Sequence, residues 1–228
     1  MAGAGLAGER RQLKKKRARS RGIRHPARNA VVFGLATLAG VALVWMGAVD
    51  MRETGRSGSP WLALGLFPAL LCPIAFVHYL RMIPVFRDLQ GGRSAIARWT
   101  VPAEEFDRFR EEQQRIPAAS ILVNFYRPPK DTPASGVEVI FSDRGVLVGD
   151  GYFPLSPTGK RRLQSVAYVA SDPPTIEFGM VITTSVRTSS LTYATQRALE
   201  TLRVPVATDA RRQAGEVVDR FQSAIDRG

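Results

Sequence analysis

The residues AVVFGLATLAGVALVWMGAV, from Ala30 to Val49, contain no Asp, Glu, Lys or Arg, and neither do the residues WLALGLFPALLCPIAFVHYL, from Trp61 to Leu80. An α-helix of this length rises about 30 Å, which matches the hydrocarbon thickness of a bilayer. Of the 228 residues, 45% are hydrophobic and 23% are charged, which excludes a disordered or collagen-like chain. Because the apolar residues gather in two uncharged stretches, the sequence predicts two transmembrane helices rather than an ordinary soluble protein.

A cleaved signal peptide is the competing interpretation of the first stretch. The apolar region at 30–49 is longer than the core of a signal peptide, and the basic segment before it is also too long. No clear small-x-small cleavage site ends the stretch. We therefore expect it to be an uncleaved membrane anchor.

Most of the positive charge lies before the first stretch. The formal net charge is +12, and residues 1–29 carry ten basic side chains against Glu9 alone, a net of +9. Lys and Arg next to a span stay on the cytoplasmic side and attract anionic lipid. Nucleic-acid binding is the alternative, but this arm has no Phe, Tyr or Trp to stack on bases, so we expect no nucleic-acid partner. The densest run of basic residues is Lys14, Lys15, Lys16 and Arg17.

The flanking residues predict the orientation of the two spans. Trp45 and Trp61 mark one membrane interface, and the loop Asp50–Pro60 between the spans is short and neutral. The arm before the first span and Arg81 and Arg87 after the second are positive, so both termini are expected in the cytoplasm. The excess of Arg over Lys, 27 to 5, favours a bacterial chain, hence a multi-pass protein of the bacterial inner membrane.

Two features inside the spans carry further expectations. Pro68 and Pro73 remove backbone donors and predict kinks in the second span. Small residues recur four apart, which lets helices approach closely. This spacing indicates packing between the two spans, with dimerisation as the alternative. The pairs are Ala30/Gly34, Ala36/Gly40 and Gly65/Ala69.

The rest of the chain, residues 94–228, reads as one α+β domain. A first strand is expected at Ser94–Thr100, and a helix starts at Pro102 with acidic residues in its first turn. The turns Ser142–Gly145 and Asp150-Gly151 predict a β-meander. The strands expected after that helix are 121–126, within a strand-like stretch that begins at 118, and then 137–141, 146–149, 152–155, 163–169, 175–182, 191–195 and 199–206.

A C-terminal amphipathic helix follows the last strand. Thr208 or Asp209 is the expected N-cap. We expect a small β-sandwich or barrel whose open end this helix covers. Its apolar stripe comprises Ala214, Val217, Val218, Phe221 and Ile225.

The strand count, the Asp150-Gly151 turn, the strand containing Leu163 and Val166, the Pro-Pro turn before Ile176 and the last helix together resemble bacterial membrane-associated pleckstrin-homology-like domains. The resemblance covers about residues 94–226. The chain departs from the usual form of these domains in the helix before the meander and in the strand at 118–126.

Two short motifs point to a second resemblance. The residues ARWTVPAEEF at 97–106 and RVPV at 203–206 are similar to those of bacterial two-span membrane proteins of uncharacterised activity. The resemblance assigns no chemical role to these residues, which serve as structural landmarks.

The sequence offers little catalytic chemistry. Gly3, Gly5 and Gly8 form a G-x-G-x-x-G motif, but no strand precedes it, so we expect no pyrophosphate-binding loop there. The two histidines lie in the arm and at the membrane, so we expect neither a catalytic triad nor a histidine metal site in the domain. Cys72 is the only cysteine, which excludes an intramolecular disulfide and a Cys-based metal site. The sequence therefore predicts no enzyme, no cofactor and no metal site. The candidate acid/base carboxylates, each also explained by a helix or a turn, are Glu104, Glu105, Glu111, Glu112, Asp143 and Asp150.

Lys160, Arg161 and Arg162 form the one basic cluster of the domain. Each basic residue near an anionic surface contributes about 1 kcal/mol of binding, so the cluster is a candidate contact for lipid head groups. An ordinary solvated loop is the alternative interpretation.

The expected organisation is a basic arm at 1–29, a helical hairpin at 30–80 with spans 30–49 and 61–80, a connector at 81–93 and a cytoplasmic domain at 94–228. The expected function is binding or scaffolding at the membrane surface, with anionic lipid, a membrane protein or a second copy as partner. Alternatives are an accessory subunit acting through its spans and, less favoured, a carboxylate-dependent enzyme.

Overall fold

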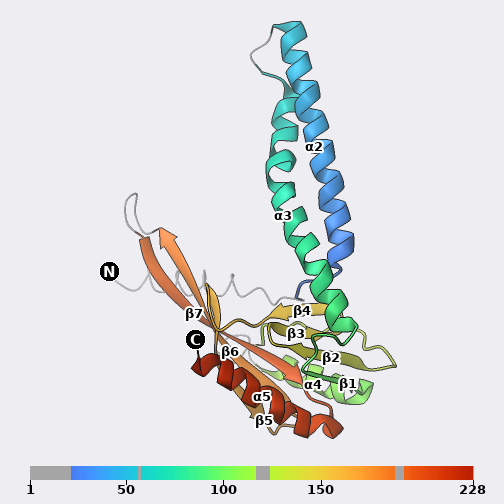
Figure 1. Cartoon of the computed structure of the whole chain (residues 1–228), viewed down its shortest axis with the longest axis vertical. Coiled ribbons are helices and arrows are strands. Elements are labelled where there is room, and N and C mark those ends of the chain that lie inside the picture. The colour runs from blue at the N-terminus through green and yellow to red at the C-terminus, as the bar shows by residue number, and fades with distance from the viewer. Residues whose placement is uncertain (1–21, 56–57, 117–123, 188–192, 228) are drawn as a thin grey trace. The chain divides into compact units, whose positions relative to one another are not determined.

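The structure is a computed structural model that describes residues 22–55, 58–116, 124–187 and 193–227 (Figure 1). The chain divides into two compact units. Arg24–Arg93 forms the helical unit, and Ile23 groups with the α+β unit that begins at Ser94.

The helical unit consists of two long antiparallel helices, α2 (Pro26–Thr54, 29 residues) and α3 (Pro60–Gln90, 31 residues) (Figure 1). Each begins with a proline, whose fixed φ and missing N–H suit the first helical position. Gly55 ends α2 in the left-handed region at φ 65°, and its N–H donates to the Met51 carbonyl at 3.1 Å. Both helices are longer than the uncharged stretches within them.

Glycines let the backbones of α2 and α3 approach closely. A Cβ on Gly65 would lie 2.7 Å from the Gly40 carbonyl oxygen and 2.8 Å from the Val44 nitrogen. A Cβ on Gly40 would lie 2.7 Å from the Ala69 nitrogen and 3.0 Å from Pro68 Cγ. The expected packing between the two helices is therefore confirmed for these small residues. α3 continues through Pro68 as a helix.

The outward faces of both helices are apolar and exposed. Trp45 is 73% exposed, Phe67 70% and Ile74 69%. Only 17% of the most apolar window of α2 and 6% of that of α3 is buried. The two helices are long and apolar enough to cross a membrane, and so little burial distinguishes them from the core helix of a soluble protein.

The α+β unit contains two antiparallel sheets (Figure 1). The first has the order β1-β2-β3-β4 and the second the order β5-β6-β7. Helix α4 (Ala103–Arg115) lies between β1 and β2 in sequence, and η1 (Thr208–Ala210) leads into the C-terminal helix α5 (Arg211–Asp226). The strands are β1 (Ala97–Val101), β2 (Val137–Ser142), β3 (Gly145–Val148), β4 (Gly151–Pro154), β5 (Arg161–Val169), β6 (Thr175–Arg187) and β7 (Tyr193–Pro205). The α+β class, the meander β2-β3-β4 and the terminal helix agree with expectation.

The last strands differ from the expectation. Strands at 191–195 and 199–206 were expected to be separate, but β7 is continuous across the described part of this region. It pairs with β6 from Arg187↔Tyr193 to Thr175↔Pro205. β5 reaches only to Ile182, so the far half of β6 and β7 is a two-stranded ribbon without a third strand among the described residues. A ribbon outside the core requires no apolar alternation, which explains why the polar residues at 195–198 do not break the strand. Leu191 and Thr192 lie outside the described residues.

The segment after α4 is only partly described. Of the strand-like stretch expected at 118–126, residues 118–123 lie outside the described part. Asn124 forms a parallel bridge with Thr201 of β7. Its side-chain amide donates to the Arg203 carbonyl at 3.1 Å and accepts from the Arg203 N–H at 2.9 Å. The Asn124 side chain thus satisfies the backbone groups of Arg203 that a neighbouring strand would otherwise satisfy.

A phenylalanine from each sheet meets one from α5 in the core. Phe221 of α5 lies 6.4 Å from Phe141 of β2 and 5.3 Å from Phe178 of β6, measured between ring centroids. Ala214, Val217 and Phe221 are buried, so the apolar stripe of α5 is core, as expected. One apolar face of each sheet and the apolar stripe of α5 thus bury one another in a common core cluster.

The expected N-cap of the last helix was wrong. The N-cap of α5 is Ala210, with no side-chain cap, because Thr208 and Asp209 lie in the preceding turn η1. The Thr208 hydroxyl donates instead to Glu105 of α4.

Candidate functional site

The structure separates the three residues of the basic cluster. In β5, Arg161 forms an ion pair with Glu200 at 3.2 Å, and its Cζ lies 4.0 Å from the centre of the Phe125 ring. Its side chain is 27% exposed. Burial lowers the pKa of Arg161, and the negative charge of Glu200 opposes that shift. Arg161 is therefore committed to contacts within the domain.

Strand alternation explains why Arg161 and Arg162 differ. Neighbouring residues of a strand point to opposite faces, and Arg161 shares a face with Leu163, which is 3% exposed. Arg162 points away from that face and is exposed. Because the strand was expected to begin at Leu163 rather than at Arg161, all three basic residues were expected to lie together in one loop.

Lys160 and Arg162 are the members of the cluster that face solvent. The Thr183 N–H donates to the Lys160 carbonyl at 2.8 Å, which fixes this position at the start of β5. Two exposed cations beside a strand end can contact an anionic surface. The arm residues expected to contact lipid, Lys14 to Arg17, lie outside the described residues.

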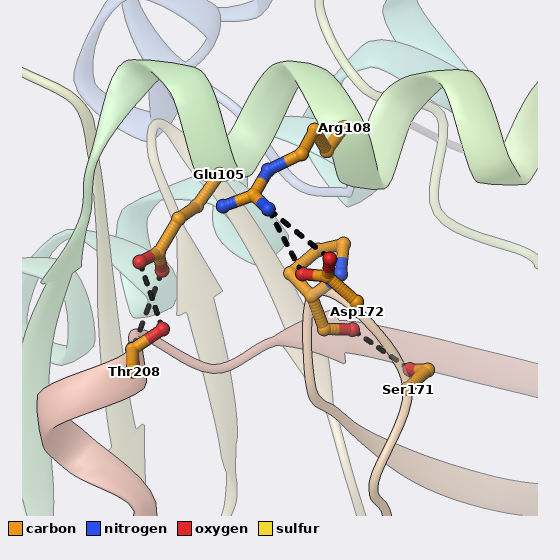
Figure 2. Close-up of polar contacts among 6 residues, drawn as sticks. Glu105, Arg108, Ser171, Asp172 and Thr208 are labelled. Carbon is orange, nitrogen blue, oxygen red and sulfur yellow. Dashed lines mark hydrogen bonds and ion pairs between the residues drawn. The ribbon is translucent and has the colours of Figure 1, made fainter.

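The candidate carboxylates are dispersed over the α+β unit, and several have structural partners. Glu105 accepts from the Thr208 hydroxyl at 2.8 Å and from its backbone N–H at 3.2 Å (Figure 2). Asp143 accepts from Arg220 at 2.7 Å, which raises the pKa of that guanidinium. Glu111 pairs with Arg115 at 3.7 Å. Among the described residues, no group of three or more His, Cys, Asp or Glu side chains is placed to hold a metal ion.

Figure 2 shows how α4 is tied to two loops. Arg108 donates to both carboxylate oxygens of Asp172, at 3.0 and 3.2 Å. The Ser171 hydroxyl donates to the Pro173 carbonyl at 2.7 Å within the same turn, whose Asp172-Pro173 bond is cis. With the Glu105–Thr208 contact, these bonds attach α4 to the β5–β6 turn and to the start of η1. The polar residues in this region have a structural role.

The structure adds a contact that sequence reasoning missed. Ile23, two residues before α2, pairs antiparallel with Tyr152 of β4. The Ile23 N–H donates to the Tyr152 carbonyl, and the Tyr152 N–H donates to the Ile23 carbonyl, both at 2.9 Å. Ile23 is the one β-branched residue among residues 1–29, which is the sequence signal that could have indicated a strand partner.

Comparison of the chain with models of protein families, with curated proteins and with solved structures found no match in any of the three.

Proposed function

We propose that this protein is a two-span protein of the bacterial inner membrane that presents a pleckstrin-homology-like binding or scaffolding domain at the cytoplasmic surface. The observation that carries the proposal is the exposed apolar surface of α2 and α3, which in water would be a large aggregation-prone patch. Lipid tails would cover it and match its length.

The alignment of α2 with α3 supports the proposal that both helices cross the same bilayer. A Cβ on Gly47 would lie 2.5 Å from the Leu62 nitrogen, and a Cβ on Gly34 would lie 3.1 Å from the Phe76 ring. At this offset Arg28 near the start of α2 is level with Arg81 of α3. The uncharged stretches therefore coincide along the hairpin, with charges at matching heights, as a bilayer requires.

The pairing of Ile23 with Tyr152 supports the orientation. Residues joined by backbone hydrogen bonds lie on the same side of a membrane, so the end of the basic arm and the α+β unit share one compartment. An even number of spans between the basic arm and the α+β unit also puts both in one compartment. The positive charge of the arm favours the cytoplasm as that compartment.

The type of domain is proposed from its architecture. A four-stranded and a three-stranded antiparallel sheet are followed by a helix that closes the core, which is the arrangement that the resemblance to pleckstrin-homology-like domains implies. Helix α4 departs from that arrangement. We propose a binding role without catalysis, since Glu105 and Asp143, two of the candidate carboxylates, join parts of the fold.

Anionic lipid is the ligand that we propose for the exposed part of the basic cluster. Lys160 and Arg162 are the proposed contacts, supplemented by the basic arm, and Arg161 is withdrawn from this set because it pairs with Glu200. The anchor would hold these side chains near the head groups, so a weak intrinsic affinity would suffice.

Reporter fusions in a bacterial host test the proposed topology. A reporter that is active only in the cytoplasm is expected to work when fused before Met1 or after Gly228 and to fail when inserted at Gly58. A reporter that is active only outside the cytoplasm should give the reverse result. Extraction of the protein by alkaline carbonate without detergent, or external activity after Gly228, would contradict the proposal.

A further inference from the structure

The outer edge of β4 is paired with Ile23, a residue of the same chain that precedes α2. Ile23 and Tyr152 form a hydrogen-bonded antiparallel pair, in which each backbone N–H donates to the carbonyl of the other residue at 2.9 Å. Tyr152 itself is only 4% exposed. Ile23 therefore adds one bridge to the outer edge of β4.

Gly22 permits this approach. Its φ is +75°, in the region that favours glycine, and a Cβ there would lie 2.8 Å from the Tyr152 carbonyl oxygen and 3.0 Å from Phe153 Cζ. The left-handed conformation and the close contact with β4 each disfavour a side chain at position 22. A segment that did not bind β4 would not need glycine at this position.

The chain leaves little slack between this pair and the helix. Only Arg24 and His25 separate Ile23 from Pro26, the first residue of α2. His25 is left-handed at φ 45°, and the Asn29 side-chain amide donates to the Arg24 carbonyl at 2.8 Å. The connection between Ile23 and α2 is therefore only two residues long.

We infer that Gly22 and Ile23 form a latch that fastens the residues just before α2 to strand β4 of the α+β unit, in addition to the covalent attachment of this unit after α3. The chain passes between the two units twice, at Ile23 and at Ser94. With the latch closed, both passages begin at residues that belong to the α+β unit. The inference rests on the proposed function only in placing the latch at a membrane surface.

Amide hydrogen exchange of the full-length chain in detergent tests the latch. The variant Ile23→Pro removes the N–H that donates to Tyr152, and Ile23→Val is its control because it keeps both hydrogen bonds. Exchange of the Tyr152 amide should rise about tenfold or more in Ile23→Pro and stay unchanged in Ile23→Val, while β2 amides remain protected. A Tyr152 amide that exchanges equally fast in all three proteins would overturn the inference.

A second pair of variants separates contact from backbone strain. Gly92 has a φ of +74°, and a Cβ at this position would have no neighbour within 4 Å, so Gly92→Ala strains the backbone without a clash. Gly22→Ala should release the Tyr152 amide, and Gly92→Ala should leave it protected. Equal release in both variants would overturn the latch.

A cross-link keeps the inference testable if Ile23→Pro fails to fold. Paired residues of this bridge type have Cα atoms about 5.5 Å apart, within the range that a disulfide spans. In a chain with Cys72→Ser, Ile23→Cys and Tyr152→Cys should form an intramolecular disulfide on mild oxidation, seen as linked peptides by mass spectrometry. Failure to link in the folded chain would contradict the latch, whereas carbonate extraction reports on membrane insertion independently.

Discussion

At the residue scale, Arg161 owes its role to the strand on which it lies. Its guanidinium lies over the Phe125 ring and forms an ion pair with Glu200, whereas Arg162, one residue later, is exposed. A counter-charge and an aromatic ring face each stabilise a partly buried cation, and this site supplies both. Local sequence shows only consecutive basic residues, because the partners come from a segment 36 residues earlier and from β7.

We predict that Glu200→Gln destabilises the domain by about 1–3 kcal/mol, because it leaves the half-buried Arg161 without that counter-charge. Glu111→Gln is the matched control, since it breaks an exposed pair at 3.7 Å and should cost less than about 0.5 kcal/mol. Thermal unfolding of the full chain in detergent, followed by tryptophan fluorescence, measures both. Equal effects of the two substitutions would show that Arg161 does not depend on Glu200.

At the element scale, the hairpin of α2 and α3 depends on glycine. The backbones meet where Gly40 faces Gly65, and the side chains on the outward faces remain exposed. Close packing of helix backbones stabilises association in lipid, where apolar surface alone gives no driving force between helices. The spacing of small residues in the sequence predicted this contact. It did not reveal that Gly47 also contacts α3, against Leu62.

Gly65→Val should separate the two helices, because its Cβ would lie 2.7 Å from the Gly40 carbonyl oxygen and from Leu43 Cβ. We expect a loss of about 1–3 kcal/mol in stability. Ala63→Val is the control, since Ala63 lies on an exposed face of the same helix and should tolerate the change. Thermal aggregation of the detergent-solubilised protein compares the two variants, and a lower midpoint for Ala63→Val than for Gly65→Val would refute this packing account.

At the scale of the whole molecule, the two units are joined at two points in the chain, and the proposed lipid contacts belong to one of them. Lys160 and Arg162 are exposed at the start of β5, and the basic arm precedes the latch. In the proposed topology the cations of the arm and of the α+β unit would therefore face the same leaflet. Their combined attraction would orient the domain rather than anchor it, since the two helices are the anchor in the proposed topology.

The double variant Lys160→Ala/Arg162→Ala tests this attraction in the full-length protein reconstituted in nanodiscs. In wild type, residues 155–160 should exchange amide hydrogens up to about thirtyfold more slowly in anionic than in zwitterionic lipid, which corresponds to about 2 kcal/mol for two cations. The double variant should lose this difference. Arg211→Ala/Arg212→Ala removes equal charge from α5 and should retain it; the opposite result would place the lipid contact elsewhere.

The sequence by itself determined the two apolar helices, the α+β class, the meander and the apolar stripe of α5. These features follow from charge-free length, turn residues and side-chain periodicity, which are properties of neighbouring residues. The tertiary structure alone decided that Arg161 faces inward, that β7 is continuous, that Glu105 bonds Thr208 and that Ile23 pairs with Tyr152. Each of these depends on residues that are distant in the chain and become neighbours only when the sheets and helices pack, so no local pattern encodes them.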